Sequence, residues 1–510
     1  MTSKTAQQDF ELIADLIHQH AVDEPSRTAL IEGSHTLTYS QLDVLMDRVA
    51  AALQQAGLTT GDAIAICATM SVAYAAVFLG ALRAGCVVAP LAPGSTPDGL
   101  ARMLSDSGAR ILFADASTAE VIGPPGILAR VALDSSQVGR PLQEWLAPAG
   151  TKPQRPALTP SAAFNIIYSS GTTGEPKGIV QPHGMRWAHV KRGKDYGYGP
   201  AAIALLSTPL YSNTTLVVFF PTLAYGGTAV LMPKFDAAAY LRLAEQHRVT
   251  HTMLVPVQYQ RLMARPDFGD FDLSSYHMKF STSAPFSAAV KADVLARWPG
   301  GLVEFYGMTE GGGSCVLEAH LFPTKLHTVG RPPEGHDLRL IDDEGRELPP
   351  GEAGEVVGHS PGMMTGYFGR PEKTREAEWF APDGKRFIRT GDVGRFDAEG
   401  FLTLFDRKKD MIISGGYNIY PSDLEAVLRE HADVADVAVV GMPSEQWGET
   451  PLAFVVRRGG ASASEEELLQ FVNARVGKTQ RLSGLRFIDE LPRSAIGKIL
   501  KRELRNHNSP

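Results

Sequence analysis

Residues 168–178 are the stretch around which the chain is organised, Tyr168-Ser169-Ser170-Gly171-Thr172-Thr173-Gly174-Glu175-Pro176-Lys177-Gly178. An apolar segment, 164–167, precedes it and is typical of the end of a buried strand. Glycine lets the backbone bend where a Cβ atom would clash, so that successive N–H groups can face one anion. The serine and threonine hydroxyls add donors and Lys177 adds a positive charge, which together suit a polyphosphate. The register of a Walker A loop does not fit, and this composition alone is more often that of an ordinary loop, so other motifs must decide.

The length of the chain and the order of its segments predict two unequal domains. The chain has 510 residues, more than the roughly 250–300 that one hydrophobic core usually supports. Up to about residue 329, strand-like and helix-like segments alternate, which predicts an α/β fold with parallel sheets packed by helices. Turn-rich segments then predict small antiparallel sheets, and a compact α+β pattern begins at Arg407.

Local patterns place the individual elements. Thr38 and Gln41 form a capping-box pattern, and apolar residues at helical spacing follow until Gly57. A further helix is predicted from Ser71 to Ala84. Strands are predicted at 63–66, 86–91, 111–114, 202–206, 227–232 and 251–255, with a helix over 235–247. In the C-terminal part the predicted helices are 421–431, 464–476 and 498–506, and the predicted strands are 435–440, 452–456 and 485–488.

Composition excludes several classes of protein. Hydrophobic residues make up 44% and charged residues 21%, and the net charge is 49 − 56 = −7, which argues against a nucleic-acid surface. The 3 cysteines show no metal-ligand spacing, which indicates a reducing compartment. The N-terminus has no apolar signal core, and prolines and glycines interrupt the apolar run 216–232. We therefore expect a soluble, cytoplasmic protein without a membrane span.

Four further patterns lie downstream of the loop. Glu304-Phe305-Tyr306-Gly307-Met308-Thr309-Glu310 combines an aromatic residue, a glycine and a Thr-Glu pair. Because about one or two carboxylates hold Mg²⁺ together with substrate phosphates, one glutamate beside a nucleotide suffices. The others are Arg389-Thr390-Gly391-Asp392, the charged run Asp406-Arg407-Lys408-Lys409-Asp410, and Pro492 to Lys498, which ends in Gly497-Lys498. Each of them alone is typical of an ordinary turn or a solvated surface.

Together and in this order, the patterns from residue 168 to residue 498 resemble those of the adenylate-forming superfamily. This superfamily includes acyl-CoA synthetases, aryl-CoA ligases, peptide-synthetase adenylation domains and firefly luciferases. The resemblance implies an N-terminal AMP-binding domain over 1–406, with helix-packed mixed sheets and a small barrel-like subdomain. It also implies a small mobile α+β domain over 407–510, with a hinge near Lys409. Its implied chemistry joins a carboxylate to the α-phosphorus of ATP, releases pyrophosphate, and lets a thiol displace AMP from the acyl-adenylate, with ATP, Mg²⁺ and coenzyme A as cofactors.

The resemblance assigns the nucleotide contacts residue by residue. Glu310 would hold Mg²⁺, Thr309 would contact the α-phosphate, and Tyr306 would lie against the adenine ring. Asp392 would accept both ribose hydroxyls, with Arg407 beside it. The implied nucleotide-binding set is completed by Ser169, Ser170, Gly171, Thr172, Thr173, Gly174, Lys177, Ser283, Ala284, Pro285, Glu304, Phe305, Gly307 and Met308.

The resemblance also implies the catalytic groups. Lys498 matches the lysine of the superfamily's Pro-x-x-x-x-Gly-Lys pattern, and its ammonium would neutralise charge that develops between the carboxylate and the α-phosphate. Lys409 would be the pivot between two domain orientations, and the face with Gly415 and Gly416 would line the thiol channel. The implied catalytic set is Lys498, Thr309, Glu310 and Lys409.

The acid pocket departs from the relatives. Peptide-synthetase domains that take α-amino acids have an Asp where this chain has Ser212, and many acyl- and aryl-CoA ligases have a His there. No carboxylate is thus available for an α-ammonium group, and we expect an aryl or medium-chain acid. Ser283, in Ser283-Ala284-Pro285, also replaces the usual glycine of the adenine loop. The implied pocket residues are His183, Tyr211, Ser212, Asn213, Thr282, Gly307 and Gly312.

The acceptor of the acyl group stays open between two carriers. Only 510 − 498 = 12 residues follow Lys498, too few for a carrier-protein domain, so coenzyme A is favoured over the phosphopantetheine of a separate carrier protein. A nucleotide-binding regulatory protein without catalysis is a third hypothesis, against which Glu310, Asp392 and Lys498 argue. A luciferase-like oxygenase has no positive support. The sequence does not decide whether the protein forms a homodimer.

Overall fold

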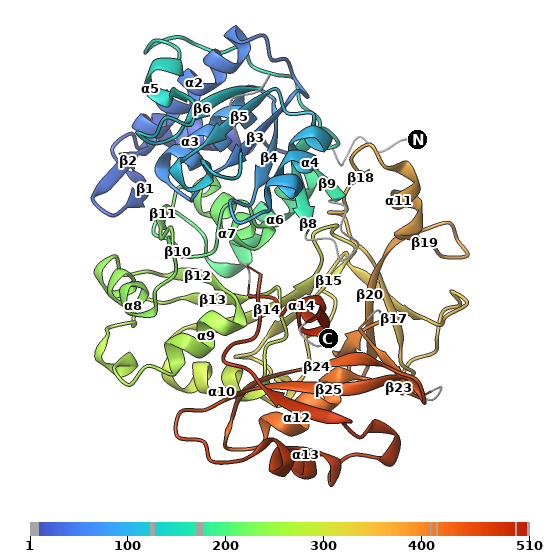
Figure 1. The fold of residues 1–510 in the computed structure, drawn as a ribbon. Helices are drawn as coiled ribbons and strands as arrows, with labels where there is room; N and C mark the ends of the chain where they lie inside the picture. The colour runs from blue at the N-terminus through green and yellow to red at the C-terminus, as the bar shows by residue number, and fades with distance from the viewer. Residues whose placement is uncertain are drawn as a thin grey trace.

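The protein has an α/β fold with two eight-stranded mixed sheets, a five-stranded antiparallel sheet and a small C-terminal α+β unit (Figure 1). The computed structural model describes residues 10–122, 128–169, 177–408, 410–414, 417–494 and 497–506. The predicted large N-terminal part with mixed sheets and the small C-terminal part are both confirmed.

The first eight-stranded sheet carries the strands on either side of the Gly/Thr-rich loop. Its order is β18-β9-β8-β4-β3-β5-β6-β7. In this order, each neighbouring pair from β8 through β4, β3, β5 and β6 to β7 is parallel. Strand β9 pairs antiparallel with both β8 and β18. Its strands are β3 (Ala63–Cys67), β4 (Val87–Leu91), β5 (Ile111–Ala114), β6 (Ala129–Ala132), β7 (Arg140–Pro141), β8 (Ala163–Ser169), β9 (Lys177–Pro182) and β18 (Gly366–Tyr367).

The second eight-stranded sheet contains the strand that leads into the Tyr-Gly-x-Thr-Glu motif, because β14 ends at Gly307. Its order is β15-β14-β13-β12-β10-β11-β1-β2, parallel except for the two edge pairs. Its strands are β1 (Thr28–Glu32), β2 (His35–Thr38), β10 (Ile203–Leu206), β11 (Thr228–Leu231), β12 (His251–Leu254), β13 (Met278–Ser281), β14 (Gly301–Gly307) and β15 (Ser314–Glu318).

Helices fill the space around the two sheets. On β10, Ala204 and Leu206 join the largest core cluster, whereas Leu205 joins the cluster on the opposite face, so this strand is buried on both sides. The helices are α1 (Ile13–Asp23), α2 (Tyr39–Gln55), α3 (Val72–Arg83), α4 (Pro97–Ser107), α5 (Leu142–Trp145), α6 (His183–Arg192), α7 (Asn213–Ala224), α8 (Ala237–Gln246), α9 (Pro256–Met263) and α10 (Ala288–Arg297).

Helix α2 shows why the local signals were informative. The Thr38 hydroxyl accepts a hydrogen bond from the N–H of Gln41 at 3.3 Å, and the Gln41 side chain accepts one from the N–H of Thr38 at 2.9 Å. This capping box satisfies two N–H groups that the helix leaves free. Leu42, Met46 and Val49 are fully buried, as their helical spacing predicts.

The apolar run 216–232 forms a helix and a strand. It begins inside α7, which contains Pro221, turns at Gly226 and Gly227, and continues as β11. Across the described residues, no helix combines the length and the hydrophobicity that crossing a membrane requires.

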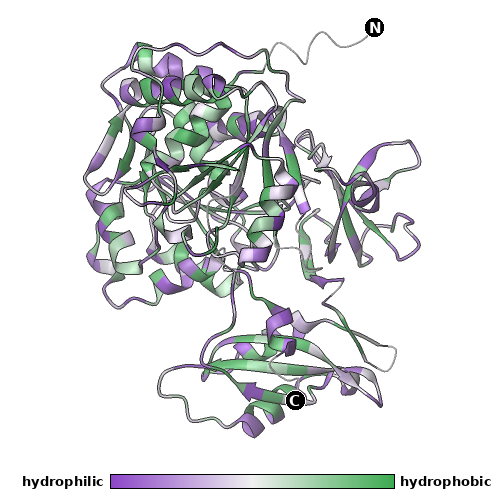
Figure 2. Cartoon of the chain, turned by 45° about the horizontal axis from the view of Figure 1, so that its top comes forward, coloured by the Kyte–Doolittle hydropathy of each residue, from purple (hydrophilic) through white to green (hydrophobic). Residues whose placement is uncertain are grey.

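The rest of the chain forms two smaller units. The subdomain predicted to be barrel-like holds five antiparallel strands, with α11 (Pro371–Glu376) beside them. Green apolar strands lie inside the C-terminal unit in Figure 2, and its two core clusters contain only residues from Ile412 onward. The strands are β16 (Asp337–Ile341), β17 (Gly354–His359), β19 (Glu378–Phe380), β20 (Arg386–Phe396) and β21 (Leu402–Arg407), then β22 (Ile412–Ser414), β23 (Tyr417–Ile419), β24 (Val434–Ser444), β25 (Gly448–Arg457) and β26 (Gly484–Phe487). The C-terminal helices are α12 (Pro421–Arg429), α13 (Glu465–Asn473) and α14 (Lys501–Asn506).

Candidate active site

A cavity of about 1510 Å³ lies where the carboxyl end of β14 meets α6, the start of α7, the small antiparallel sheet and the C-terminal unit. Ligands of α/β proteins bind at the carboxyl ends of sheet strands, so this position favours a binding site. The predicted site residues that line the cavity are Lys177, Tyr211, Ser212, Asn213, Thr282, Ser283, Phe305, Tyr306, Gly307, Met308, Thr309, Glu310, Arg407 and Lys498.

Three of the predicted site residues are buried behind the cavity wall. Glu304 points to the far side of β14, where it pairs with Lys291 of α10. His183 packs edge-on against Phe164 at 4.9 Å between ring centroids, and burial lowers its pKa to about 4. Gly312 leaves no room for a Cβ atom against Ile388. None of these three residues lines the cavity, so their assignment to the ligand contacts stays a prediction. Ala284, Pro285 and Asp392 also do not belong to the lining.

Several predicted residues lie outside the described part of the chain. They are Ser170, Gly171, Thr172, Thr173, Gly174, Lys409, Gly415 and Gly416. Ser169 is the last residue of β8.

Asp392 joins two groups of the cavity wall. Its Oδ2 atom accepts a hydrogen bond from the Tyr306 hydroxyl at 2.8 Å, and its Oδ1 atom lies 2.9 Å from Nε of Arg407. Burial raises the pKa of Tyr306 far above its ordinary value, and the charge of Asp392 adds to this effect. Tyr306 is therefore a neutral donor whose ring is held in one orientation. Residues distant in sequence thus meet where the resemblance implied a nucleoside.

Glu310 and Lys177 meet at Tyr367, a residue that the sequence patterns did not single out. The Tyr367 hydroxyl donates to Oε1 of Glu310 at 2.9 Å, and Nζ of Lys177 lies 5.4 Å from the centroid of the Tyr367 ring. Within the described residues, no three His, Cys, Asp or Glu side chains gather as a metal site. A cation here would therefore need oxygen ligands from a bound phosphate in addition to Glu310.

Arg186 organises the polar floor behind this wall. Its guanidinium donates to Oδ1 of Asn165 at 3.2 Å, to Oδ1 of Asn213 at 2.7 Å and to the side chain of Gln181. The Gln181 amide donates in turn to the carbonyl of Thr309 at 2.7 Å. Burial lowers the pKa of Arg186 to about 9. One buried cation thus links β8, β9 and α7 to the Thr-Glu pair.

Ser283 has a backbone conformation that favours glycine. Its φ of 80° lies in the left-handed region that a residue with a Cβ atom rarely adopts. Its hydroxyl lies 2.6 Å from the Thr214 hydroxyl. This hydrogen bond between hydroxyls offsets part of the conformational cost.

Lys498 reaches the cavity from the C-terminal unit. It lines the cavity together with Ser494 and Arg502, and its backbone N–H donates to the Ser494 hydroxyl at 3.2 Å. Arg493 donates to the carbonyl of Gly497 at 2.6 Å, which fixes the turn before the lysine. Gly497 has a φ of +76°, and a Cβ atom there would lie 2.9 Å from a methyl group of Val257 in α9.

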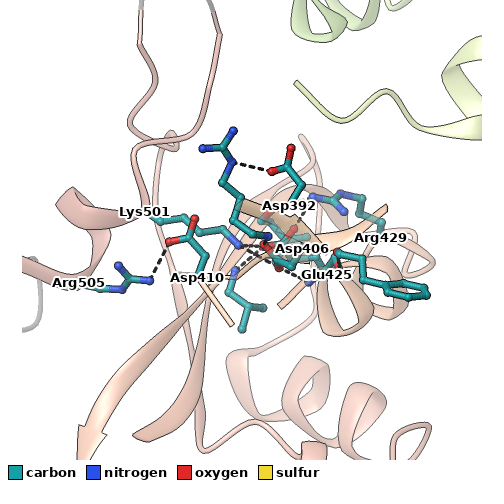
Figure 3. A network of polar contacts seen from close by, with 12 residues as sticks. Asp392, Asp406, Asp410, Glu425, Arg429, Lys501 and Arg505 are labelled. Carbon is teal, nitrogen blue, oxygen red and sulfur yellow. Dashed lines mark hydrogen bonds and ion pairs between the residues drawn. The ribbon is translucent and has the colours of Figure 1, made fainter. Parts of the chain in front are cut away.

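Ion pairs surround the junction between the two units. From α14, Lys501 pairs with Glu425 at 3.0 Å and Arg505 with Asp410 at 3.1 Å (Figure 3). The carboxylate of Asp406, near the end of β21, lies 3.9 Å from Nζ of Lys501. It accepts hydrogen bonds from the backbone N–H groups of Arg407 and Ser422. Burial raises the pKa of Asp406. These contacts fasten α14, and with it the segment after Lys498, to the start of the C-terminal unit.

Lys408 connects the same junction to the small antiparallel sheet. Its ammonium lies 2.8 Å from Asp343 and 3.3 Å from Glu355, which Arg389 also pairs with at 2.7 Å. Burial opposes ionisation of Glu355, but hydrogen bonds and charge from Arg389 and Lys408 keep its pKa below the ordinary value.

The sequence patterns missed one face of α6. Met185, Ala188, His189 and Arg192 line the cavity at i, i+3, i+4 and i+7, which is the spacing of a single helix face. That spacing was visible in the sequence, but only the placement of α6 shows that the face borders a cavity. His336, which precedes β16, also lines the cavity.

Comparisons with known proteins agree with this geometry. The profile of the AMP-binding enzyme family matches residues 17–368, and that of the AMP-binding enzyme C-terminal domain matches residues 423–498. Feruloyl-CoA synthase of Amycolatopsis sp is 36% identical over 94% of this chain and 96% of its own. Fatty acid--[acyl-carrier-protein] ligase ScoC of Streptomyces coeruleorubidus is 34% identical over 96% of this chain and 94% of its own.

Among solved structures, ATP-bound MatB from Rhodopseudomonas palustris superposes with a TM-score of 0.85 at 29% identity, covering 97% of this chain and 98% of its own. The family profile spans more than half of the chain, and it includes the Gly/Thr-rich loop and the Tyr-Gly-x-Thr-Glu motif. The chain belongs to the AMP-binding enzyme family and is an AMP-forming acid–thiol ligase.

Proposed function

We propose that the protein activates an aryl or medium-chain carboxylic acid with ATP and transfers the acyl group to coenzyme A. The observation that carries this proposal is that Lys498 of the C-terminal unit lines the same cavity as Glu310, Tyr306 and Arg407 of the large domain. The C-terminal unit thus brings a cation to acidic and aromatic groups of the large domain. This arrangement suits a reaction in which negative charge moves between a carboxylate and a phosphate.

Each group has a definite part in this proposal. The Tyr306 ring would hold the adenine, and Asp392 with Arg407 would hold the ribose. Glu310 would bind Mg²⁺, which shields the phosphates and makes pyrophosphate a better leaving group. Lys498 would stabilise the charge on the α-phosphate as the carboxylate attacks. Closure of the C-terminal unit over the cavity would exclude water from the acyl-adenylate.

We further propose that the boundary between the domains lies at 406–407 and that the hinge is near Lys409. Independent hydrophobic cores on the two sides support this division, because few side chains would have to separate if one unit turned. The contacts of Lys408 with Asp343 and Glu355 would hold one orientation, and their loss would release it.

A larger residue at Gly497 is expected to weaken that orientation. In Gly497→Val, the side chain needs a left-handed backbone and meets Val255 and Val257 within 3.2 Å. We expect acyl-adenylate formation to slow at least about tenfold, since a few kcal/mol of strain fall on the docked state. Pre-steady-state pyrophosphate release measures this step. The matched control, Gly459→Val, lies on the surface of the same unit with no atom within 4 Å of its Cβ position. Equal rates for both variants would contradict the proposed docking.

The second candidate acceptor is the phosphopantetheine of a carrier protein. The similarity to a ligase whose name includes an acyl-carrier protein favours it, whereas the similarity to feruloyl-CoA synthase favours coenzyme A. Both candidate functions share the first half-reaction, which forms the acyl-adenylate, and differ only in the thiol that accepts the acyl group.

The deciding experiment is pyrophosphate release from Mg·ATP with a panel of aryl, short, medium and long-chain acids. Each acid is tested alone, with coenzyme A and with a phosphopantetheinylated carrier protein. Fast multiple turnover with coenzyme A is the expected result. A single-turnover burst that coenzyme A does not accelerate would contradict transfer to coenzyme A and favour the carrier protein. Absence of release with every acid would leave only nucleotide binding.

A further inference from the structure

Helix α6 presents a face to the cavity that none of the steps above uses, and the C-terminal half of this face is polar. Met185 and Ala188 begin this face, and His189 and Arg192 continue it toward the C-terminus of the helix. The face lies opposite Val217, one turn after Asn213 in α7, and beside Phe305 at the end of β14. These are the elements that carry the predicted acid pocket, so this face of α6 borders that predicted pocket.

Arg192 is a half-buried cation that has no counter-ion among the residues that the structure describes. Its Cζ atom lies 4.4 Å from the centroid of the Phe305 ring. Within the described part of the chain its guanidinium makes no hydrogen bond and no ion pair within 4.0 Å. Burial lowers its pKa, which the charge of Asp195 partly opposes. Asp195 and Glu334 also line the cavity, but neither carboxylate pairs with Arg192. The free carbonyl groups at the C-terminus of α6 add partial negative charge nearby.

The two histidines beside Arg192 add neutral hydrogen-bonding groups. Burial, and then the charge of Arg192, lower the pKa of His189, whose Nδ1 atom is buried without a partner among the described residues. Burial and the same arginine lower the pKa of His336 to about 4. The backbone N–H of Ser314 donates to Nδ1 of His336 at 3.0 Å, so the proton of the neutral ring sits on Nε2. The cluster therefore offers one full positive charge and further donor capacity.

Two fully buried cations of this protein show which partners Arg192 lacks among the described residues. Arg186 has three side-chain acceptors and Lys291 has a glutamate and two carbonyls. A guanidinium that is removed from water without such partners is costly, and a ligand that supplies an anion recovers the cost through paired, charge-assisted hydrogen bonds. Arg192 is thus prepared for an anionic group inside the acid pocket.

We propose that the acid substrate carries a second carboxylate, at the end remote from the reacting one, and that Arg192 is the residue that selects it. This inference rests on the proposed function and names its substrate class. The reacting carboxylate faces the nucleotide side with Lys498, and the second carboxylate reaches Arg192, with His189 and His336 as additional hydrogen-bonding groups.

The test compares matched pairs of acids that differ only at the remote end. Each dicarboxylic acid of four to eight carbons, and each benzene dicarboxylic acid, is paired with its mono-amide, which keeps length and shape but has no second charge. Pyrophosphate release with coenzyme A gives kcat/KM for both members. We expect the wild-type protein to prefer the best diacid over its mono-amide by at least about 10²-fold, since a site built for a charged partner rejects the analogue that lacks it.

Arg192→Met removes the cation at nearly constant volume. The diacid-to-amide selectivity is expected to fall by about 10²-fold, mainly through KM, and Arg192→Lys should recover part of it. Lys194→Met is the matched control, because it removes an exposed positive charge two residues away that does not line the cavity. Thermal melts of all variants verify folding.

The outcomes separate this inference from the proposed function. If mono-acids support pyrophosphate release and no diacid is preferred, the proposal of a second carboxylate is wrong and the ligase function stands. The same conclusion follows if Arg192→Met leaves the diacid-to-amide selectivity unchanged. If no acid of either kind supports release, the proposed function itself fails. A selectivity change in Lys194→Met as large as that in Arg192→Met would show a long-range charge effect and would overturn the assignment of Arg192.

Discussion

Replacing Lys498 by alanine is expected to slow acyl-adenylate formation about 10²–10³-fold, because one preorganised charge aimed at the reacting atoms contributes a few kcal/mol to the barrier. The structure supplies the reason for so large an effect. Lys498 lines the cavity that also holds Glu310 and Thr309, and a turn held by Arg493 and Ser494 positions it. Loss of the ammonium leaves the charge on the α-phosphate without this partner.

The measurement is single-turnover pyrophosphate release with the best acid of the panel. The thioester half-reaction, started from synthetic acyl-adenylate and coenzyme A, is measured in parallel and is expected to lose much less rate. Lys478→Ala is the matched control, since it removes an exposed lysine of the same unit that lies outside the cavity. If Lys498→Ala stays within threefold of the wild-type protein in single turnover, Lys498 has no part in adenylation.

The sequence was a good guide wherever a signal was local. The capping box at Thr38, the helical spacing that follows it and the short apolar strands all form as predicted, because hydrogen bonds and side-chain periodicity within one segment determine them. The motifs between residues 168 and 498 also indicated a nucleotide site. Five of their described members, Lys177, Tyr306, Glu310, Arg407 and Lys498, line one cavity.

Predictions were weaker where the answer depended on another segment. Glu304 alternates with Phe305 on β14, and only the position of α10 behind the sheet shows that its carboxylate pairs with Lys291. Tyr367 reaches Glu310 because β18 pairs with β9 at the edge of a sheet, although β9 ends at Pro182, 366 − 182 = 184 positions before β18 begins. In the sequence, Arg192 is one more basic residue at the end of a helix; only the structure shows that none of the described residues supplies its counter-ion.

The burial of Glu304 leads to the largest expected change in stability. Its side chain is 5% exposed and that of Lys291 is 1% exposed, and the two form an ion pair between β14 and α10. Nζ of Lys291 also donates to the carbonyls of Leu326 at 2.8 Å and Thr328 at 3.1 Å. Burial raises the pKa of Glu304 although Lys291 opposes the shift, so desolvation of the pair offsets much of its attraction.

Removing one partner is therefore expected to cost far more than removing both. Glu304→Leu leaves the ammonium of Lys291 buried without its counter-ion, and we expect the free energy of unfolding to fall by about 3–5 kcal/mol. In the double variant with Lys291→Met, apolar side chains of similar volume occupy both positions, and most of this loss should be recovered. Urea unfolding followed by tryptophan fluorescence measures the change, because the fully buried Trp298 lies just after α10.

A second ion pair on the same helix supplies the control. Asp293 and Arg297 of α10 pair at 3.0 Å, with side chains 41% and 40% exposed, so that water already solvates both charges. Asp293→Asn should change the free energy of unfolding by less than about 1 kcal/mol. A double variant no more stable than Glu304→Leu would mean that the glutamate stabilises β14 by its shape and not by its charge. Equal losses for Glu304→Leu and Asp293→Asn would show that burial adds nothing to the cost of an unpaired charge here.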